Sequence, residues 1–84
     1  MNEEMAANIG FIMGNKQRER IVQVLGSKGD ISAEKIAKFE HIPVNGVKKT
    51  LAELAEKRIA SETHEIWSLT DIGKEIEKEL KKQA

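Results

Sequence analysis

The sequence predicts a mainly helical fold with one small β-hairpin, an arrangement of the α+β class. Apolar residues recur at spacings of three and four, the period of amphipathic helices, in the segments 15–26, 33–39, 43–57 and 71–82. Between the last two of these segments, short runs rich in β-forming residues lie at 59–61 and 66–69. Glycine, proline and polar residues separate the segments and supply turns, so a single small domain can hold them all.

Residues 1–14 form an apolar N-terminal arm. Asn2 followed by two glutamates is a favourable helix start, although Gly10 and Gly14 each weaken a helix by up to about 1 kcal/mol. The apolar residues that could line one side of such a helix are Met5, Ile9, Ile12 and Met13. An arm of this kind either packs back on the core or pairs with another copy of the chain, and we expect it to contribute to a homodimer.

The first core helix is predicted at 15–26, with Asn15 as its cap. The turn chemistry of residues 26–30 ends it, and Ile31 then adds one short strand rung. Its expected inner face comprises Ile21, Val24 and Leu25, with Val22 at the margin.

A second helix is predicted at 33–39, and residues 40–43 form a tight turn after it. Ser32 is a good N-cap, and Glu34 places a favourable negative charge in the first turn. We expect Ile42 to enter the core between this helix and the next. The residues expected to be buried on the helix itself are Ile36 and Ala37, with Phe39 as a further candidate.

The central helix, 43–57, is the segment around which the rest is organised. Pro43 suits the first helical position, where its missing N–H would be unbonded anyway. Val47, Leu51 and Leu54 share one face and should be buried. The opposite face carries Asn45, Lys49, Ala52 and Glu56, with Lys48 on its flank. The helix is therefore expected to be held from its apolar side and to present amide and ammonium groups to a partner.

Residues 59–69 predict a β-hairpin whose tip is the tetrapeptide 62–65, Glu-Thr-His-Glu. Thr70 then caps the last helix, 71–82, with Asp71 in its first turn. The apolar stripe of this helix is narrow and consists of Ile72, Ile76 and Leu80. Such a stripe fits either packing across a small domain or a contact between two helices.

Composition narrows the classes of function. The formal net charge is zero, but residues 14–58 hold ten Lys or Arg against six Asp or Glu, a net of +4, while 1–13 and 59–84 are each −2. A basic centre between acidic ends is typical of one surface that faces nucleic acid, although chance variation in a highly charged surface would give the same. The chain has no cysteine, signal-peptide pattern or membrane-length apolar run, so we expect a cytoplasmic protein.

Three motifs carry a resemblance that covers roughly residues 15–80. Arg18-Glu19-Arg20-Ile21-Val22-Gln23-Val24-Leu25 resembles the RxxI[LV]xxL start of many winged helix-turn-helix domains, and residues 36–54 are similar to their helix-turn-helix. Trp67-Ser68-Leu69-Thr70-Asp71-Ile72-Gly73 resembles the YxLTxxG that joins wing to last helix in MarR-like bacterial and archaeal regulators. The small size and the Lys/Glu-rich end also look archaeal. The implied architecture for 15–84 is a three-helix core with a wing and a C-terminal helix.

The resemblance implies a sequence-specific transcriptional regulator that binds double-stranded DNA, usually as a homodimer, with 43–57 as the recognition helix. Carried over to this chain, it makes Asn45, Lys48 and Lys49 candidates for base edges and Val44 a candidate for a thymine methyl group. The candidates for phosphate contacts are Ser32, Lys35, Lys16 and Arg18, and His64 at the hairpin tip is a candidate for a pH-sensitive one. Gly46 would allow backbones to approach closely.

Two features depart from that pattern and leave an alternative open. The predicted hairpin tip is acidic, and the exposed face of the central helix has no arginine, the commonest reader of guanine. The chain is therefore also compatible with a winged-helix protein-interaction module that does not bind DNA. Taken without context, Lys48 and Lys49 are an ordinary solvated helix face.

The sequence offers no sign of catalysis or of a cofactor. No nucleophile stands beside a candidate base in a known motif, and there is no glycine-rich phosphate loop. His41 and His64 are far apart and lack partners at metal-ligand spacing, so no metal site is predicted.

Overall fold

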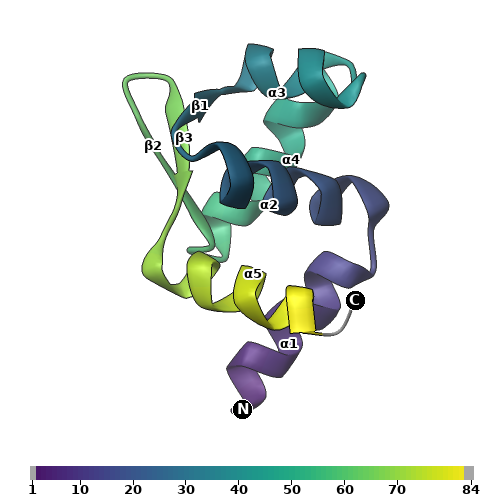
Figure 1. The fold of residues 1–84 in the computed structure, drawn as a ribbon, viewed down its shortest axis with the longest axis vertical. Helices are drawn as coiled ribbons and strands as arrows, with labels where there is room; N and C mark the ends of the chain where they lie inside the picture. The colour runs from purple at the N-terminus through teal and green to yellow at the C-terminus, as the bar shows by residue number, and fades with distance from the viewer. Residues whose placement is uncertain (1, 83–84) are drawn as a thin grey trace.

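Five α-helices and three short β-strands make up residues 2–82, the part of the 84-residue chain that the computed structural model describes (Figure 1). The order is α1 (Glu3–Met13), α2 (Lys16–Lys28), β1 (Ile31–Ser32), α3 (Ala33–Glu40), α4 (Val44–Glu56), β2 (Ala60–Thr63), β3 (Ile66–Leu69) and α5 (Asp71–Lys82). The expected class, mainly helical with a small antiparallel sheet, is confirmed.

Short polar side chains begin four of these helices. In each, a side-chain oxygen accepts a hydrogen bond from a backbone N–H that the first helical turn leaves without a partner. The accepting and donating residues are Asn2 and Met5 (2.7 Å), Asn15 and Arg18 (3.1 Å), Ser32 and Lys35 (3.2 Å), and Thr70 and Gly73 (3.0 Å). The predicted caps at Asn2, Asn15, Ser32 and Thr70 are therefore confirmed.

The sheet is antiparallel with the order β1-β3-β2. Ile31 pairs with Trp67, so the predicted strand rung exists and joins the hairpin to the start of α3. The hairpin turn is shorter than predicted, because β2 and β3 remain paired as far as Thr63 and Ile66. His64 and Glu65 both have positive φ (51° and 65°), the conformation whose twist matches that of two paired strands and so closes a hairpin in two residues.

The core forms around α2, which packs against α1, α3, α4, α5 and β3. Because α2 has neighbours on so many sides, Val22 is fully buried rather than marginal. The helix also continues to Lys28, beyond the predicted end, and stops at Gly29, whose φ of 77° a side chain would disfavour. The largest fully buried side chains are Ile12, Ile21, Leu25, Ile36, Leu51, Leu54, Ile59, Ile76, Val22 and Val47.

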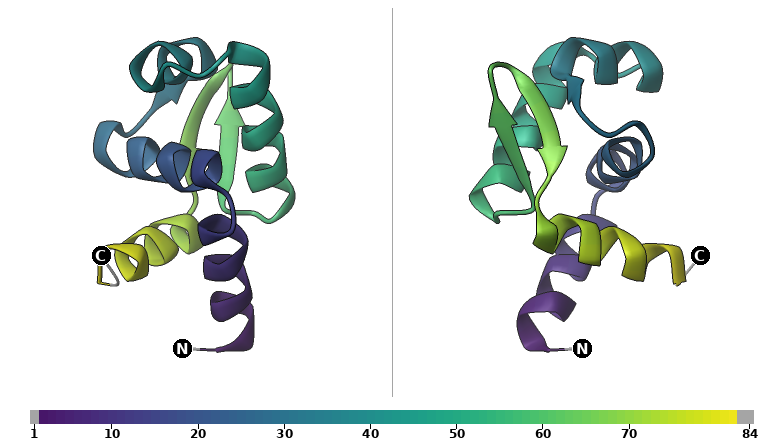
Figure 2. Two further views of the ribbon diagram at one scale, coloured as in Figure 1. Left: turned by 90° about the vertical axis from the view of Figure 1, so that its right-hand side faces the viewer. Right: turned by 60° about the vertical axis from the view of Figure 1, so that its left-hand side comes forward.

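The N-terminal arm is a helix that packs on the rest of the chain. α1 contacts α2 and α5, and its Ile9 and Ile12 belong to the single buried cluster. Of the two alternatives for the arm, packing back on the core is therefore the one observed in the monomer. Figure 2 shows that α1 and α5 form one end of the molecule, while α3, the start of α4 and the hairpin tip form the other.

Two apolar residues, the burial candidate Phe39 and the α5 stripe residue Ile72, are exposed in the monomer. Phe39 is 52% exposed, because the eight-residue helix α3 packs through Ala33 and Ile36, and Phe39 lies on the far flank of Ile36. Ile72 is 41% exposed, because α5 covers the core with Gly73, Ile76 and Leu80 instead. Pro43, predicted as the first helical residue, is instead the N-cap residue that precedes α4. The first helical residue is Val44.

Candidate nucleic-acid interface

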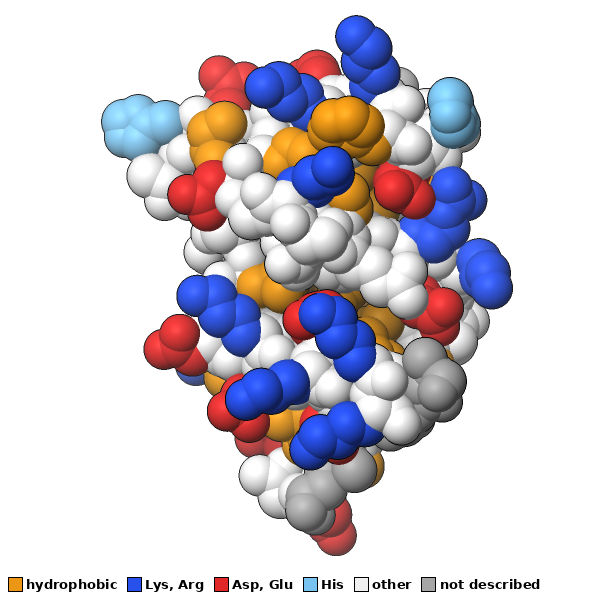
Figure 3. Space-filling model, in the orientation of Figure 1, with side chains coloured by type: hydrophobic (Ala, Val, Ile, Leu, Met, Phe, Trp, Pro, Cys, Tyr) orange, Lys and Arg blue, Asp and Glu red, His pale blue; other side chains and the backbone are white. Residues whose placement is uncertain are grey.

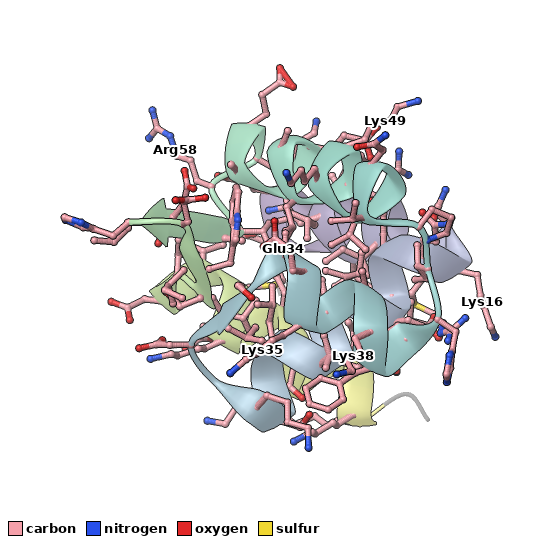
Figure 4. The ribbon with its side chains drawn as sticks, turned by 90° about the horizontal axis from the view of Figure 1, so that it is seen from above. Lys16, Glu34, Lys35, Lys38, Lys49 and Arg58 are labelled. Carbon is pink, nitrogen blue, oxygen red and sulfur yellow. The ribbon has the colours of Figure 1, made fainter. Side chains whose placement is uncertain are left out.

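Helix α4 has one buried and one exposed side, as its periodicity predicts. Val47, Leu51 and Leu54 are fully buried against the core. The opposite side is exposed, and we call it the α4 front: Asn45, Lys48, Lys49 and Ala52. Seen from above, Lys49 projects outward from α4 and away from the body of the protein (Figure 4). Within residues 2–82 these side chains remain exposed, so a partner molecule could reach them.

The N-terminus of α4 differs from those of the other described helices. Pro43 supplies no side-chain hydrogen bond, and no acidic residue lies in the first turn. In contrast, the first turns of α1, α2, α3 and α5 each contain an acidic side chain. The first N–H groups of a helix have no intrahelical acceptor, and the helix dipole adds partial positive charge there. The exposed end of α4 therefore combines unmatched donors with Lys48 and Lys49.

Lys48 has one ion-pair partner among residues 2–82. Its Nζ lies 3.7 Å from Oε2 of Glu34 on α3, and both side chains are mostly exposed (58% and 64%). Pairs of this kind contribute little to stability in water, so a partner molecule can displace the glutamate at small cost. Lys49 has no carboxylate within ion-pair distance among residues 2–82.

The predicted phosphate contacts fall in different places. Lys16 and Lys35 are exposed, and Ser32 is half-buried with its oxygen accepting from the Lys35 N–H. In Figure 4, Lys35 projects from α3 on the opposite side from Lys49, and Glu34 lies between them. Val44 is half-buried at the start of α4. The structure therefore brings Asn45, Lys48 and Lys49 together but puts Lys35 on another flank.

Arg18 is held by contacts inside the protein. Its Nε donates to Glu53 Oε1 at 3.4 Å, and Nη1 donates to the Phe11 carbonyl oxygen at 3.1 Å. The guanidinium also lies 3.9 Å from the centre of the Phe11 ring, which is favourable cation–π geometry. With a side chain only 22% exposed, Arg18 joins α1 and α4 to α2, and its guanidinium is engaged within the protein.

The hairpin places negative charge beside α4. His64 is exposed at the tip, next to Glu65. A cavity of about 310 Å³ lies between the hairpin and helices α3 and α4. We call it the acidic groove, and it is lined by Ala33, Glu34, Lys48, Glu62, Glu65 and Trp67. Three carboxylates against one ammonium make this side of Lys48 unfavourable for phosphate.

Gly46 does not face the α4 front. A Cβ built at this position would lie 3.6 Å from Ile42 Cγ2 and 3.7 Å from Gln17 Oε1, which are ordinary contacts. The missing side chain therefore points toward α2 and the preceding turn. The expectation that Gly46 serves close approach of backbones has no support in this geometry.

The sequence interpretation missed one group of residues. Lys28, Lys38 and Phe39 surround a second groove, on the flank of α3 that also carries Lys35. The signal was present in the spacing, because positions 35, 38 and 39 lie on adjoining parts of the helix surface, with Phe39 at the edge of the buried stripe next to Ile36. Assigning Phe39 to the core hid it.

Comparison with known proteins and a search for other site types add no assignment. Neither a protein-family model nor a curated protein sequence matches this chain. Within residues 2–82, no group of three or more His, Cys, Asp or Glu side chains is arranged to hold a metal ion. No described helix has the length and apolar character needed to cross a bilayer.

Proposed function

We propose that this chain is a winged helix-turn-helix transcriptional regulator in which α4 reads the major groove of double-stranded DNA. The observation that carries the proposal is the α4 front, an exposed amide and two exposed ammonium groups on a helix whose other side is fully buried. An α-helix fits the major groove, and these side-chain types recognise base edges there. The order of α3, turn and α4, followed by a hairpin, supports the same interpretation.

Each residue of the front has a role in this proposal. Asn45 would make paired hydrogen bonds to adenine, while Lys48 and Lys49 would donate to guanine O6 and N7. Val44 would contact a thymine methyl group. The uncapped N–H groups at the start of α4 would bind one backbone phosphate, and Lys16 and Ser32 are candidates for contacts to others.

Regulation would follow from occupancy of an operator, with no catalytic step and no cofactor. We propose a homodimer assembled through α1 and α5, since Met13 and Ile72 expose apolar surface on these helices. A two-fold pair would present two α4 helices to two half-sites one helical turn apart. A protein that acts on DNA in this way would work in the cytoplasm of a bacterial or archaeal cell.

The proposal is tested by measuring the affinity of the protein for a random-sequence duplex. Fluorescence anisotropy gives this affinity at a series of salt concentrations. Phosphate contacts predict an affinity that falls steeply as salt rises from about 50 to about 200 mM. Lys48→Ala and Lys49→Ala should each weaken binding by about tenfold, because each removes a positive charge from the surface that would face the duplex. Lys81→Ala on α5 is the matched control and should leave affinity within about twofold.

Equal effects of the three alanine variants, or no duplex binding at low salt, would exclude the proposal. A second candidate would then gain, namely a protein-interaction module that uses the acidic groove. The observation that favours it is the clustering of Glu34, Glu62 and Glu65 around Trp67, which suits a lysine or arginine side chain of a partner. It predicts salt-sensitive binding of a basic peptide that Glu62→Gln weakens.

A further inference from the structure

The groove beside Phe39 takes no part in the DNA contacts proposed above. It has a volume of about 350 Å³, within the range of ligand pockets, and we call it the basic groove: Lys28, Asp30, Ile31, Lys35, Lys38 and Phe39. Figure 3 shows lysine or arginine side chains around exposed hydrophobic side chains over α3 on this face. The groove is formed by the end of α2, the loop after it and the outer flank of α3.

Phe39 is the largest exposed apolar side chain in this groove, at 52%. Beside it lies Ile31, whose side chain is almost fully buried and forms apolar floor. Lys28 Nζ lies 5.1 Å from the centre of the Phe39 ring, so an ammonium already covers part of the aromatic surface. Covering the rest of the ring with an apolar side chain would remove it from water, which is favourable.

The charges around Phe39 are unbalanced. Three lysines and one aspartate line the groove, a net of +2 in a protein whose formal net charge is zero. None of Lys28, Lys35 and Lys38 has a carboxylate within ion-pair distance among the described residues. A ligand complementary to this surface would carry an apolar group flanked by carboxylates.

Single-stranded nucleic acid is less well suited to the groove than a peptide is. Surfaces that bind single strands offer aromatic faces open for bases to stack on, along a track that follows the backbone. Here one aromatic ring is present in the groove, and the Lys28 ammonium occupies the space over its face. A concave apolar site beside Ile31 instead suits the insertion of one aliphatic or aromatic side chain.

We propose that the basic groove binds an acidic peptide segment of a partner protein, with an apolar side chain packed on Phe39 and Ile31. Carboxylates on either side of that side chain would bind Lys28, Lys35 and Lys38. In Figure 4, Lys35 and Lys38 project from α3 away from α4, so the groove and the α4 front can be occupied together. The proposal does not depend on DNA binding.

The experiment is an NMR titration of the ¹⁵N-labelled 84-residue protein with the blocked peptide Asp-Glu-Glu-Leu-Phe-Glu-Asp-Glu. Shift changes should concentrate at Lys28, Ile31, Lys35, Lys38 and Phe39, and half-saturation should fall below about 1 mM. A second peptide with Ser-Ser in place of Leu-Phe should bind about tenfold more weakly, because it lacks the apolar anchor.

Variants of the groove residues distinguish a specific peptide-binding site from nonspecific electrostatic attraction. Phe39→Ala and the pair Lys35→Gln with Lys38→Gln should each weaken peptide binding by about tenfold, and Phe39 is exposed enough for its removal to leave the fold intact. Ile66→Ala, at an exposed apolar residue on β3, and Lys81→Gln are the matched controls and should not change it.

Three results would overturn the proposal. The first is absence of saturable shifts in the groove, or equal binding of the two peptides. The second is tighter binding of an oligo-dT strand through the same residues, which would assign the groove to nucleic acid. The third is self-association without peptide that Phe39→Ala abolishes, which would assign it to a second copy. The affinity of the Phe39 and Lys35/Lys38 variants for duplex DNA is measured in a separate assay, so that loss of peptide binding is distinguished from loss of DNA binding.

Discussion

Helices α4 and α5 are built alike on their buried sides and differently on their exposed sides. Each buries one apolar stripe, and each holds equal numbers of basic and acidic residues: two of each in α4 and four of each in α5. The order of the charges along the helix is what differs. α5 begins with Asp71 and ends with Lys81 and Lys82, whereas α4 has Lys48 and Lys49 in its first half and Glu56 at its end.

The charge order of α5 favours the helix by itself. Negative charge at the start and positive charge at the end both match the helix dipole. Two ion pairs within the helix neutralise much of the remainder, Lys81 to Glu77 at 3.1 Å and Lys82 to Glu79 at 3.4 Å. The exposed side of α5 is therefore a solvated, self-compensated surface.

The charge order of α4 opposes the helix dipole. Lys48 and Lys49 lie near the positive end, and no acidic side chain or side-chain cap offsets it. Packing of Val47, Leu51 and Leu54 in the core keeps the helix formed despite this cost. Although the two helices carry equal numbers of opposite charges, the start of α4 would be stabilised by an anion, whereas the start of α5 already carries Asp71.

The substitution expected to change stability most is at Gly73 in α5. A Cβ at Gly73 in α5 would overlap the carbonyl oxygen of Ile59 and approach its carbonyl carbon to 3.1 Å. Gly73→Ala should therefore lower the free energy of unfolding by about 3 kcal/mol, since backbone must shift to admit the methyl group. Urea unfolding followed by circular dichroism measures the change, and a loss below about 1 kcal/mol would mean that α5 can move without cost.

A sharper test of the comparison gives α4 the acidic start that α5 has. Asn45→Asp should raise the free energy of unfolding by about 0.5 kcal/mol through the helix dipole. The same change should weaken duplex binding by about tenfold, because it puts a carboxylate where a base or phosphate is expected. Asp71→Asn in α5 is the control, with a stability loss of about 0.5 kcal/mol and no change in affinity.

If Asn45→Asp raises the free energy of unfolding and lowers the affinity for duplex DNA, the start of α4 binds DNA. A helix end that is only solvated would gain stability without losing affinity. An unchanged duplex affinity would show that the start of α4 does not face DNA. The α4 front would then lose its role, whatever the stability change.

The substitution at Gly46 should change stability but not duplex affinity. Its Cβ position has its nearest neighbours at 3.6 Å or more, so Gly46→Ala should stabilise the protein by about 0.8 kcal/mol through helix propensity. Because that position faces Ile42 and Gln17, duplex affinity should stay unchanged. Thermal unfolding and anisotropy measure the two quantities. A fall in affinity with the fold intact would instead restore the idea of close backbone approach at Gly46.

Residues close in sequence account for what could be predicted. The caps at Asn15, Ser32 and Thr70 act over three residues, and the buried stripe of α4 follows from helical spacing alone. Arg18 shows the limit of such reasoning. Its partner Glu53 lies 35 positions away, so no local pattern could show that its guanidinium is engaged inside the protein.

Local sequence placed the helices and the hairpin to within a few residues, because periodicity, caps and turn residues act over a few positions. Packing between the elements determines which flank of each amphipathic stripe is covered. Phe39 and Ile72 lie at stripe edges, where burial depends on the neighbouring element, and both are exposed. Tertiary packing also decided which charges meet, since Coulomb attraction depends on distance in space. It left Lys49 without an ion-pair partner among the described residues and engaged Arg18 inside the protein.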